Sequence, residues 1–214
     1  MAETLEEIAN GLRTGFEAVN RAREEALRLS RETIQYSSRT IRAVHRGEIE
    51  TAQTLAQEAK ARVEAVQTRL QDHPELLFAG YIHDSQKEYV EAEAMLAIVG
   101  GQPIPSPTTL GVEPAAYLNG IAEAASESRR HVLDLLRQGD MERADSVLKV
   151  MDDIYYELIT FDFPDAITGG LRRTTDALRA VLERTRGDLT LTLSQRRLET
   201  ALQDVGCRVS GVGV

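Results

Sequence analysis

Residues 3–45 read ETLEEIANGLRTGFEAVNRAREEALRLSRETIQYSSRTIRAVH and contain no proline. Apolar residues recur every three or four positions along them, which is the period of one face of an α-helix. The pattern lasts for about 40 residues, longer than most helices of globular proteins, and favours a helix bundle or an oligomer. The apolar positions are Leu5, Ile8, Leu12, Phe16, Val19, Ala22, Ala26, Ile34, Ile41 and Val44.

The rest of the chain continues the helical pattern between breaks formed by glycine and proline. GGQPIPSPTTLGVEP, residues 100–114, is the only long Gly- and Pro-rich connection, and no strand signal or internal repeat stands out. We expect an all-α fold of seven helices, with one domain over residues 1–205 and a flexible C-terminal tail over residues 206–214. After the long first helix, the expected helices are 48–71, 74–99, 114–137, 140–159, 164–186 and 190–203.

The composition restricts the classes of partner. The chain has 34 acidic and 25 basic residues, a net charge of −9, so a polyanion could bind only at a local basic patch. The single cysteine, Cys207, excludes an internal disulfide and fits a reducing compartment. The acidic N-terminus is unlike a signal peptide, and no apolar run reaches the roughly 20 residues that span a bilayer. We therefore expect a soluble cytoplasmic protein with no membrane partner.

Two neighbouring predicted helices each carry carboxylates spaced by about one turn. The first contains DSQKEYVEAEAML, in which Asp84, Glu88 and Glu91 share one face. The second contains NGIAEAASESRRHV, in which Glu123 and Glu127 are four residues apart. If the two faces meet inside the bundle, these acidic side chains converge on one small volume.

Converging carboxylates need protons or a divalent cation, because burying unpaired charge costs several kcal/mol per group. Oxygen ligands favour hard ions such as Mg²⁺ or Mn²⁺, which can activate water and stabilise charge on a phosphate, as in many nucleases. The alternative is a solvated acidic face, on which Lys87, Arg129 and Arg130 form ordinary surface ion pairs. The pattern alone leaves both interpretations open.

Several other kinds of site are disfavoured. A ferritin-like di-iron bundle needs Glu-x-x-His on two helices. The chain also lacks a nucleotide-binding glycine loop, a nucleophile elbow and zinc-ligand spacing. No histidine meets the di-iron requirement, because the residues three positions before His45, His73, His83 and His131 are Arg42, Leu70, Gly80 and Ser128.

A row of arginines follows the first predicted helix, nearly opposite its apolar face. It has two possible roles. The first is a charged outer face, paired within the helix to Glu24, Glu25 and Glu32. The second is a track for phosphate groups, by which an acidic protein could bind a polyanion. LRRTTDALRAVLERTR, residues 171–186, is a second Arg-rich helix with the same two possible roles. The first row comprises Arg21, Arg28, Arg31, Arg39, Arg42 and Arg46.

Four segments, which together span nearly the whole chain, resemble segments of proteins of the translin family. KEYVEAEAML resembles the Glu-Tyr-Val-Glu-Ala signature of the translin-associated factor X group, and YLNGIAEAASESRR resembles the helix that follows it in that group. REEALRLSRETIQYSSRTIRAVHRGE and TFDFPDAITGGLRRTTDALRAVLERTRGDLT resemble the first and late helices of archaeal members. The paired acidic pattern is the most specific part of the resemblance.

The resemblance implies a seven-helix subunit that assembles into a hollow shell, usually an octamer. Family members bind single-stranded RNA or DNA, and the factor X group cleaves RNA with Mg²⁺ at an acidic site facing the cavity. Carried over to this chain, Glu88 and Glu91 match the Glu-x-x-Glu pair, Glu123 stands where the family has Asp, and Glu127 matches the later Glu. These four residues are therefore the expected catalytic metal ligands for Mg²⁺ or Mn²⁺.

Under this nuclease hypothesis, the first-helix arginines, as a phosphate track, would guide the phosphates of single-stranded RNA, or of single-stranded DNA. Those residues are Arg21, Arg28, Arg31, Arg39 and Arg42. Glu123 has one methylene more than the family's Asp, so it keeps the charge on a longer arm. The alternatives are a non-catalytic single-strand-binding protein of the translin type and a purely structural helical scaffold.

Overall fold

The computed structural model describes residues 3–210, and the side chains of residues 3–203. Within this range the fold is all α-helical, as the sequence predicts, and it contains no strand. Three short elements lie between the long helices: η1 (Pro74–Leu76), α4 (Pro107–Leu110) and α7 (Asp165–Thr168). The long helices are α1 (Leu5–His45), α2 (Ile49–Arg69), α3 (Gly80–Gly100), α5 (Pro114–Gln138), α6 (Met141–Leu158) and α8 (Leu171–Ser210).

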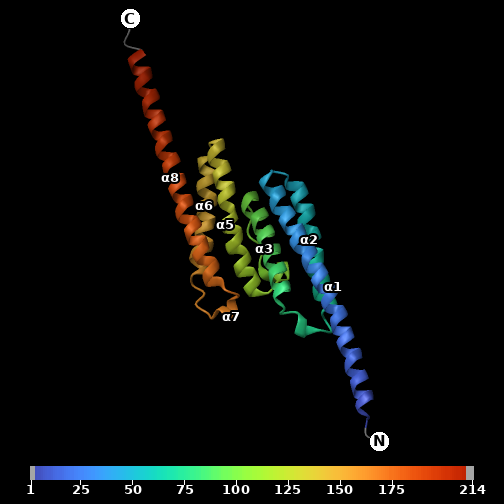
Figure 1. The fold of residues 1–214 in the computed structure, drawn as a ribbon. Helices are drawn as coiled ribbons and strands as arrows, with labels where there is room; N and C mark the ends of the chain where they lie inside the picture. Colours follow the sequence, from blue (N-terminus) through green and yellow to red (C-terminus); the bar gives the residue numbers. More distant parts are fainter. Residues whose placement is uncertain (1–2, 211–214) are drawn as a thin grey trace.

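The long helices stand side by side, with α3 and α5 in the centre (Figure 1). On one side α3 contacts α1 and α2, and on the other side α5 contacts α6 and α8. The N-terminal part of α1 extends past the bundle at one end, and the C-terminal part of α8 extends past it at the opposite end (Figure 1). The two central helices are those on which the sequence predicts carboxylates.

The long first helix is confirmed, and its ends have clear local causes. Thr4 caps the N-terminus through a capping box, because its hydroxyl accepts from the Glu7 N–H at 3.3 Å while its own N–H donates to the Glu7 carboxylate at 2.8 Å. Gly47, with φ of 74°, turns the chain into α2 after His45. Helix α1 is therefore continuous over 41 residues.

Small residues allow α3 and α5 to approach closely. Ala94 on α3 and Ala122 on α5 are fully buried in the core. At Gly120 a Cβ atom would lie 2.6 Å from Val90 Cβ and 2.7 Å from the Lys87 carbonyl oxygen, so only glycine fits without movement. This contact lies about one turn before Glu123 and sets the spacing between the two central helices.

The predicted division of the last helices is wrong. The chain does not break at RGD, residues 186–188, because Gly187 is accommodated inside α8. A single glycine costs only about 1 kcal/mol in a helix, and its neighbours are tied to other helices: Arg186 to Asp152 at 2.6 Å, and Asp188 to Arg129 at 2.7 Å.

The actual break in this region comes earlier and consists of two glycines. Gly169 and Gly170 both have positive φ, 62° and 82°, and they separate the short α7 from α8. Helix α8 then continues through Ser210, so residues 206–210 of the expected tail have a helical backbone, while residues 211–214 lie outside the described part of the chain.

The sequence predicts that no apolar segment is long enough to span a bilayer, and the helices of the structure can be compared with this prediction. Among the described residues, no helix combines the length and the apolar character needed to cross a bilayer.

Candidate functional site

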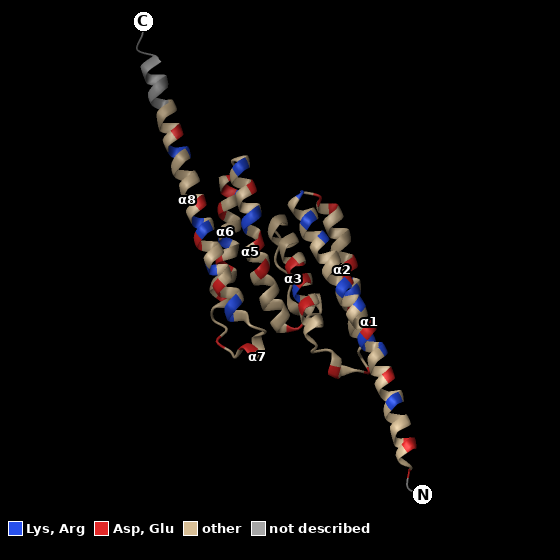
Figure 2. Ribbon diagram, viewed as in Figure 1, with Lys and Arg blue, Asp and Glu red and all other residues tan. Residues whose placement is uncertain are grey.

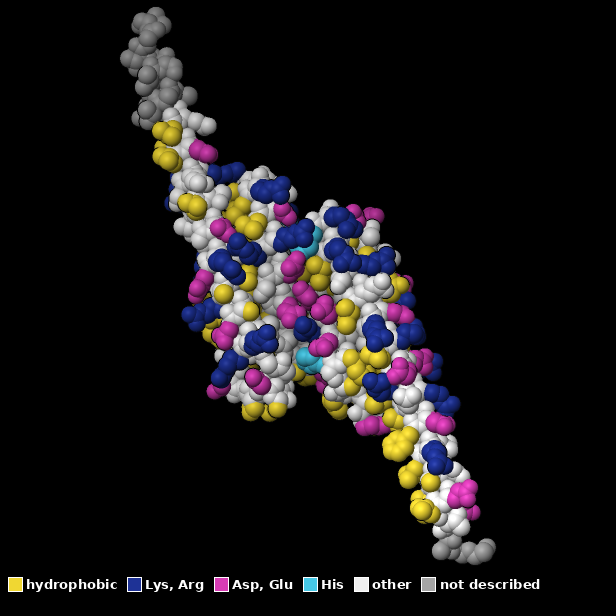
Figure 3. Space-filling view, in the orientation of Figure 1, with side chains coloured by type: hydrophobic (Ala, Val, Ile, Leu, Met, Phe, Trp, Pro, Cys, Tyr) yellow, Lys and Arg dark blue, Asp and Glu magenta, His cyan; other side chains and the backbone are white. Residues whose placement is uncertain are grey.

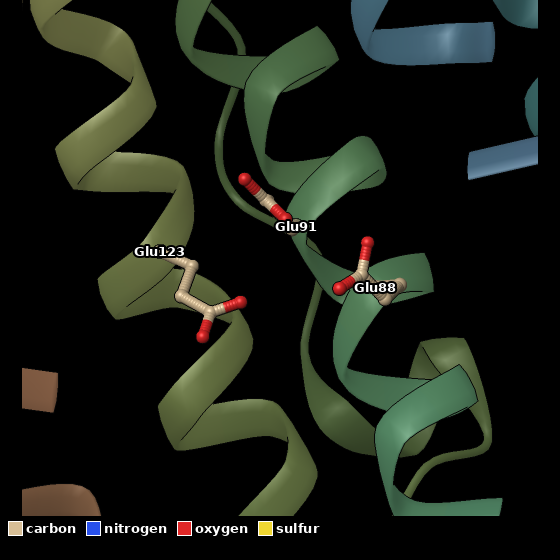
Figure 4. Close-up of side chains that lie close together, drawn as sticks. All are labelled: Glu88, Glu91 and Glu123. Atoms are coloured by element: carbon tan, nitrogen blue, oxygen red, sulfur yellow. The ribbon is translucent and has the colours of Figure 1, made fainter. Parts of the chain in front are cut away.

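Helices α3 and α5 bring three carboxylates together (Figure 4). Glu88 and Glu91 come from α3, and Glu123 comes from α5; one oxygen of each lies within 4.8 Å of the others. Their arrangement follows from the spacing of the two glutamates on α3 and from the close approach of the helices at Gly120. We call Glu88, Glu91 and Glu123 the carboxylate cluster.

Burial and mutual repulsion disfavour the ionised forms of Glu88 and Glu91 in the carboxylate cluster. Burial, and after it the neighbouring charges of Glu88, Glu123 and Glu127, together raise the pKa of Glu91 to about 8, partly opposed by Lys87. Burial also raises the pKa of Glu88, partly opposed by Lys87. In the absence of a cation, Glu91 therefore holds a proton near neutral pH.

Lys87 is part of this site. Its ammonium donates to Glu123 Oε1 at 2.8 Å and lies 3.9 Å from Glu88 Oε1. Burial lowers the pKa of Lys87, but the hydrogen bond to Glu123 and the charges of Glu123, Glu88 and Asp84 outweigh this and raise it. The lysine that the sequence suggested as a surface ion-pair partner is thus a cation attached to the cluster. Its position beside Glu88 gave no indication that it reaches across to α5.

Glu127, the fourth predicted ligand, lies outside the group of three. It follows Glu123 by one turn on α5, and its Oε1 accepts a hydrogen bond from His45 Nε2 at 2.6 Å. Because it lies one turn from Glu123 on the same face of α5, Glu127 borders the carboxylate cluster, and its charge is among those that raise the pKa of Glu91. The sequence gave no sign of this contact, because His45 is 82 residues away and no local pattern connects the two.

A groove of about 740 Å³ runs beside the carboxylate cluster, between the central helices and the start of α8. Lys87 and Glu123 line it on the side of the cluster, and Arg173 lines it on the side of α8. Asp84, on the same face of α3 as Glu88, lies in this groove and is 68% exposed. Asp84 is therefore a groove residue rather than a member of the cluster.

The donor set of the cluster fits a hard divalent cation. It offers three carboxylate oxygens and no sulfur or nitrogen ligand, which is the chemistry that Mg²⁺ and Mn²⁺ prefer. The raised pKa values of Glu88 and Glu91 show that added positive charge would be favourable there. Glu88, Glu91 and Glu123 are the residues that could hold the ion.

The five predicted RNA-guiding arginines are exposed along α1, which carries basic side chains over much of its length (Figure 2). Two of them have neighbours: Arg28 pairs with Glu32, and the Arg39 guanidinium lies 5.6 Å from the centre of the Tyr36 ring. The other three have no ion pair within the described residues. On one face of the molecule, acidic side chains gather near the middle with basic side chains on either side (Figure 3).

Comparisons with known proteins agree with this architecture, although no family model matches the chain. An uncharacterised protein of Methanocaldococcus jannaschii is 30% identical over 185 residues, which cover 86% of this chain and 82% of the relative. Among solved structures, AfC3PO in a complex with duplex RNA is 35% identical with a TM-score of 0.83, over 88% of this chain and 97% of that one.

Two further structures are similar. AfC3PO in a separate crystal structure is 34% identical, with a TM-score of 0.81 over 88% of this chain and 98% of that one. The protein apo-NeC3PO is 21% identical, with a TM-score of 0.78 over 89% of this chain and 100% of that one. At this lower identity the similarity to apo-NeC3PO shows a shared fold alone.

Proposed function

The chain belongs to the translin family, in the archaeal group that resembles translin-associated factor X, and from this we propose that it is a metal-dependent endoribonuclease acting on single-stranded RNA. The observation that carries the proposal is the carboxylate cluster, to which the two central helices contribute Glu88, Glu91 and Glu123. Such a set of oxygen ligands is suited to hydrolysis of a phosphodiester with the help of a divalent ion.

In this proposal, Glu88, Glu91 and Glu123 hold Mg²⁺ or Mn²⁺, with Glu127 beside them. When bound, such an ion lowers the pKa of water and offsets the negative charge that develops on a phosphate. These carboxylates would bind and orient the ion, and Glu91 would release its proton to water as the ion binds. Lys87 lines the groove, so by turning away from Glu123 its ammonium would reach a phosphate oxygen of the RNA and leave the Glu123 carboxylate free.

The RNA path in the proposal includes the groove beside the cluster and the exposed arginines of α1. The groove contains Arg173 and Lys87, and the five arginines add positive charge to a chain that is acidic overall. AfC3PO, a relative with 35% identity, has been solved with duplex RNA, which supports RNA as the polymer. We propose single-stranded RNA as the substrate, and a duplex RNA of the same sequence serves as the comparison for binding and cleavage. Single-stranded DNA is the second polymer whose binding and cleavage are to be compared.

We also propose that identical subunits assemble, as an octameric shell, through apolar side chains that one chain leaves exposed. On α1, Leu12 and Phe16 are 59% and 73% exposed, and on α8, Leu198 and Leu202 are 61% and 62% exposed. Apolar rows on helices that extend beyond the bundle are typical of contacts between chains. The matching surface would belong to a second copy of this chain.

The second candidate function is binding of single-stranded nucleic acid without cleavage. Two features favour it: Lys87 already neutralises part of the carboxylate cluster, and Glu123 has a longer arm than the family's Asp. Under this alternative, EDTA leaves RNA binding unchanged and no divalent ion produces cleavage.

The deciding experiment incubates purified protein with end-labelled RNA, single-stranded or duplex, with Mg²⁺, Mn²⁺ or EDTA. We expect internal cleavage of the single strand with a divalent ion, and loss of cleavage in Glu88→Gln with unchanged RNA binding and molar mass. The matched control is Glu64→Gln, because Glu64 is an exposed glutamate on α2, away from the cluster, beside Lys60. Cleavage by Glu88→Gln at the rate of the wild-type protein would reject the assignment.

A further inference from the structure

The residue that holds Glu127 comes from a different part of the chain. His45 is the last residue of α1, and its side chain is only 3% exposed. Its Nε2 lies 2.6 Å from Glu127 Oε1 on α5. A carboxylate can only accept, so Nε2 carries the proton and donates it. This hydrogen bond joins the end of the arginine-bearing helix to the edge of the carboxylate cluster.

Glu127 has no other fixed partner among the residues whose side chains are described. The hydrogen bond to His45 occupies Oε1, and no described donor or cation takes Oε2. The Glu127 side chain is 39% exposed, so packing alone would leave it several rotamers. The buried histidine ring is the rigid partner of this pair, and the flexible glutamate takes its position from it.

Glu127 follows Glu123, a member of the carboxylate cluster, by one turn on the same face of α5, so where its carboxylate lies bears on the cluster. The charge of Glu127 helps to raise the pKa of Glu91, so the two carboxylates interact electrostatically. A carboxylate that borders an ion-binding group contributes to affinity only when it is held there, because each lost rotamer otherwise costs entropy at the moment of binding. Hydrogen-bonded partners behind the ligands are known to control metal affinity in this way.

We infer that His45 is a positioning residue for Glu127, which it fixes beside Glu88, Glu91 and Glu123 so that the site binds a divalent cation. The inference rests on the proposed function for the identity of the cation, and it concerns binding rather than cleavage. Because Arg42 lies three residues before His45 on α1, the same helix end carries a proposed RNA contact and the partner of the fourth carboxylate.

The test compares two amides at position 45. In His45→Gln the side-chain nitrogen is as many bonds from Cα as Nε2 is, so the donor is kept; in His45→Asn it falls one bond short. We expect Mn²⁺ to bind about 10-fold more weakly to His45→Asn, and within about threefold of the wild-type value to His45→Gln. Mn²⁺ binding is measured by electron paramagnetic resonance on the intact protein without RNA.

The matched control is His73→Asn, since His73 also lies near a carboxylate, 3.4 Å from Glu75, but away from the cluster. It should bind Mn²⁺ as the wild-type protein does. A second route, which leaves the buried ring in place, is Glu127→Gln; it should weaken Mn²⁺ binding at least as much as His45→Asn. Combining His45→Asn with Glu127→Gln should add nothing to the loss in Glu127→Gln alone, because His45 acts only through the Glu127 carboxylate, which that change removes.

The outcomes separate this inference from the proposed function. Wild-type protein that binds Mn²⁺ but cleaves no RNA rejects the nuclease, while the order of Mn²⁺ affinities still supports the role of His45. Equal Mn²⁺ affinity in the wild-type protein and His45→Asn overturns the inference, whatever the cleavage rate. Equal losses in His45→Gln and His45→Asn also overturn it, because a structural requirement for the imidazole ring would then explain both.

Discussion

The Lys87 ammonium lies 2.8 Å from Glu123 Oε1, so a side chain of α3 supplies the counter-charge for a carboxylate of α5. An incoming divalent cation must compete with this ammonium for the Glu123 carboxylate. Lys87 therefore stabilises the cluster without metal and weakens its affinity for metal.

Replacing Lys87 separates these two effects. We expect Lys87→Gln to bind Mn²⁺ about 10-fold more tightly, and its metal-free form to lose about 1 kcal/mol of unfolding free energy with the ion pair. Calorimetric titration with Mn²⁺ and denaturation in EDTA measure the two quantities. The control is Lys60→Gln, because Lys60 lies 3.9 Å from Glu64 on an exposed face. Unchanged Mn²⁺ affinity in Lys87→Gln would mean that the ammonium does not compete.

The raised pKa of Glu91 predicts how stability depends on pH. Unfolded protein releases this proton near pH 4.5, whereas the folded, metal-free protein keeps it until about pH 8. Stability from this group is therefore present at acidic pH and is lost as the pH rises through this window, by about 3 kcal/mol between pH 5 and pH 8. Denaturation in EDTA at several pH values measures the loss.

Glu91→Gln should flatten this dependence, since glutamine resembles the protonated acid at every pH. Glu64→Gln, at an exposed position, should keep the wild-type slope. If Glu91→Gln keeps that slope as well, another group is responsible.

Gly120 tests how far the site depends on the approach of the central helices. A Cβ at this position would lie 2.6 Å from Val90 Cβ, so we expect Gly120→Ala to destabilise the protein by about 2 kcal/mol and to weaken Mn²⁺ binding as Glu123 moves away from α3. In the control, Gly187→Ala, the added methyl meets nothing within 4 Å and should stabilise α8 by up to about 1 kcal/mol. Thermal unfolding measures the melting temperature of each variant. Equal melting temperatures for Gly120→Ala and Gly187→Ala would contradict the tight contact at Gly120.

The arginines of α1 predict a salt effect on RNA binding. Removing Arg31 and Arg42, which are exposed, should lower the magnitude of the slope of log affinity against log salt by about 1.4, because two fewer phosphates of a single strand are neutralised. Filter binding to single-stranded RNA at several salt concentrations measures this slope. The double control is Lys60→Ala with Arg137→Ala, since both side chains sit in ion pairs within their own helices, outside the two arginine-rich helices. The same loss of slope in the control would show that the effect follows total charge, not the α1 track.

The exposed apolar row at the start of α1 predicts the assembly state. Leu12→Asp with Phe16→Asp should lower the molar mass in solution, because these side chains would be buried between copies. Asn10→Asp with Thr14→Asp adds the same two charges one turn apart on the other side of the helix, and should leave the mass unchanged. Light scattering after size exclusion gives the mass. If the two double variants have the same molar mass, the contact between subunits lies elsewhere.

The parts of the fold that could be predicted are those that depend only on the local period of apolar residues along one helix. The first helix needed only its unbroken apolar period, whereas the predicted break at Gly187 was wrong because the ion pairs on either side, to Asp152 and Arg129, depend on the packing of other helices. The stop at Gly169 and Gly170 requires two consecutive residues with positive φ.

For the site, spacing indicated which face of α3 and which face of α5 are acidic, and the structure brings Glu88, Glu91 and Glu123 together. Spacing could not give the register between the helices. The reach of Lys87 to Glu123, the separation of Glu127 from the group and its bond to His45 all depend on that register. A glycine inside a predicted helix, Gly120, was the available hint of a close approach.

Helices α1 and α8 leave the bundle in opposite directions (Figure 1), and α8 alone is about 60 Å long. One molecule can thus touch two neighbours at once through two different surfaces. A contact that joins unlike surfaces repeats from copy to copy; it closes into a ring when the rotation at each step divides a full turn, and otherwise grows into a filament. A copy shortened at one of these ends would join such a series and terminate it.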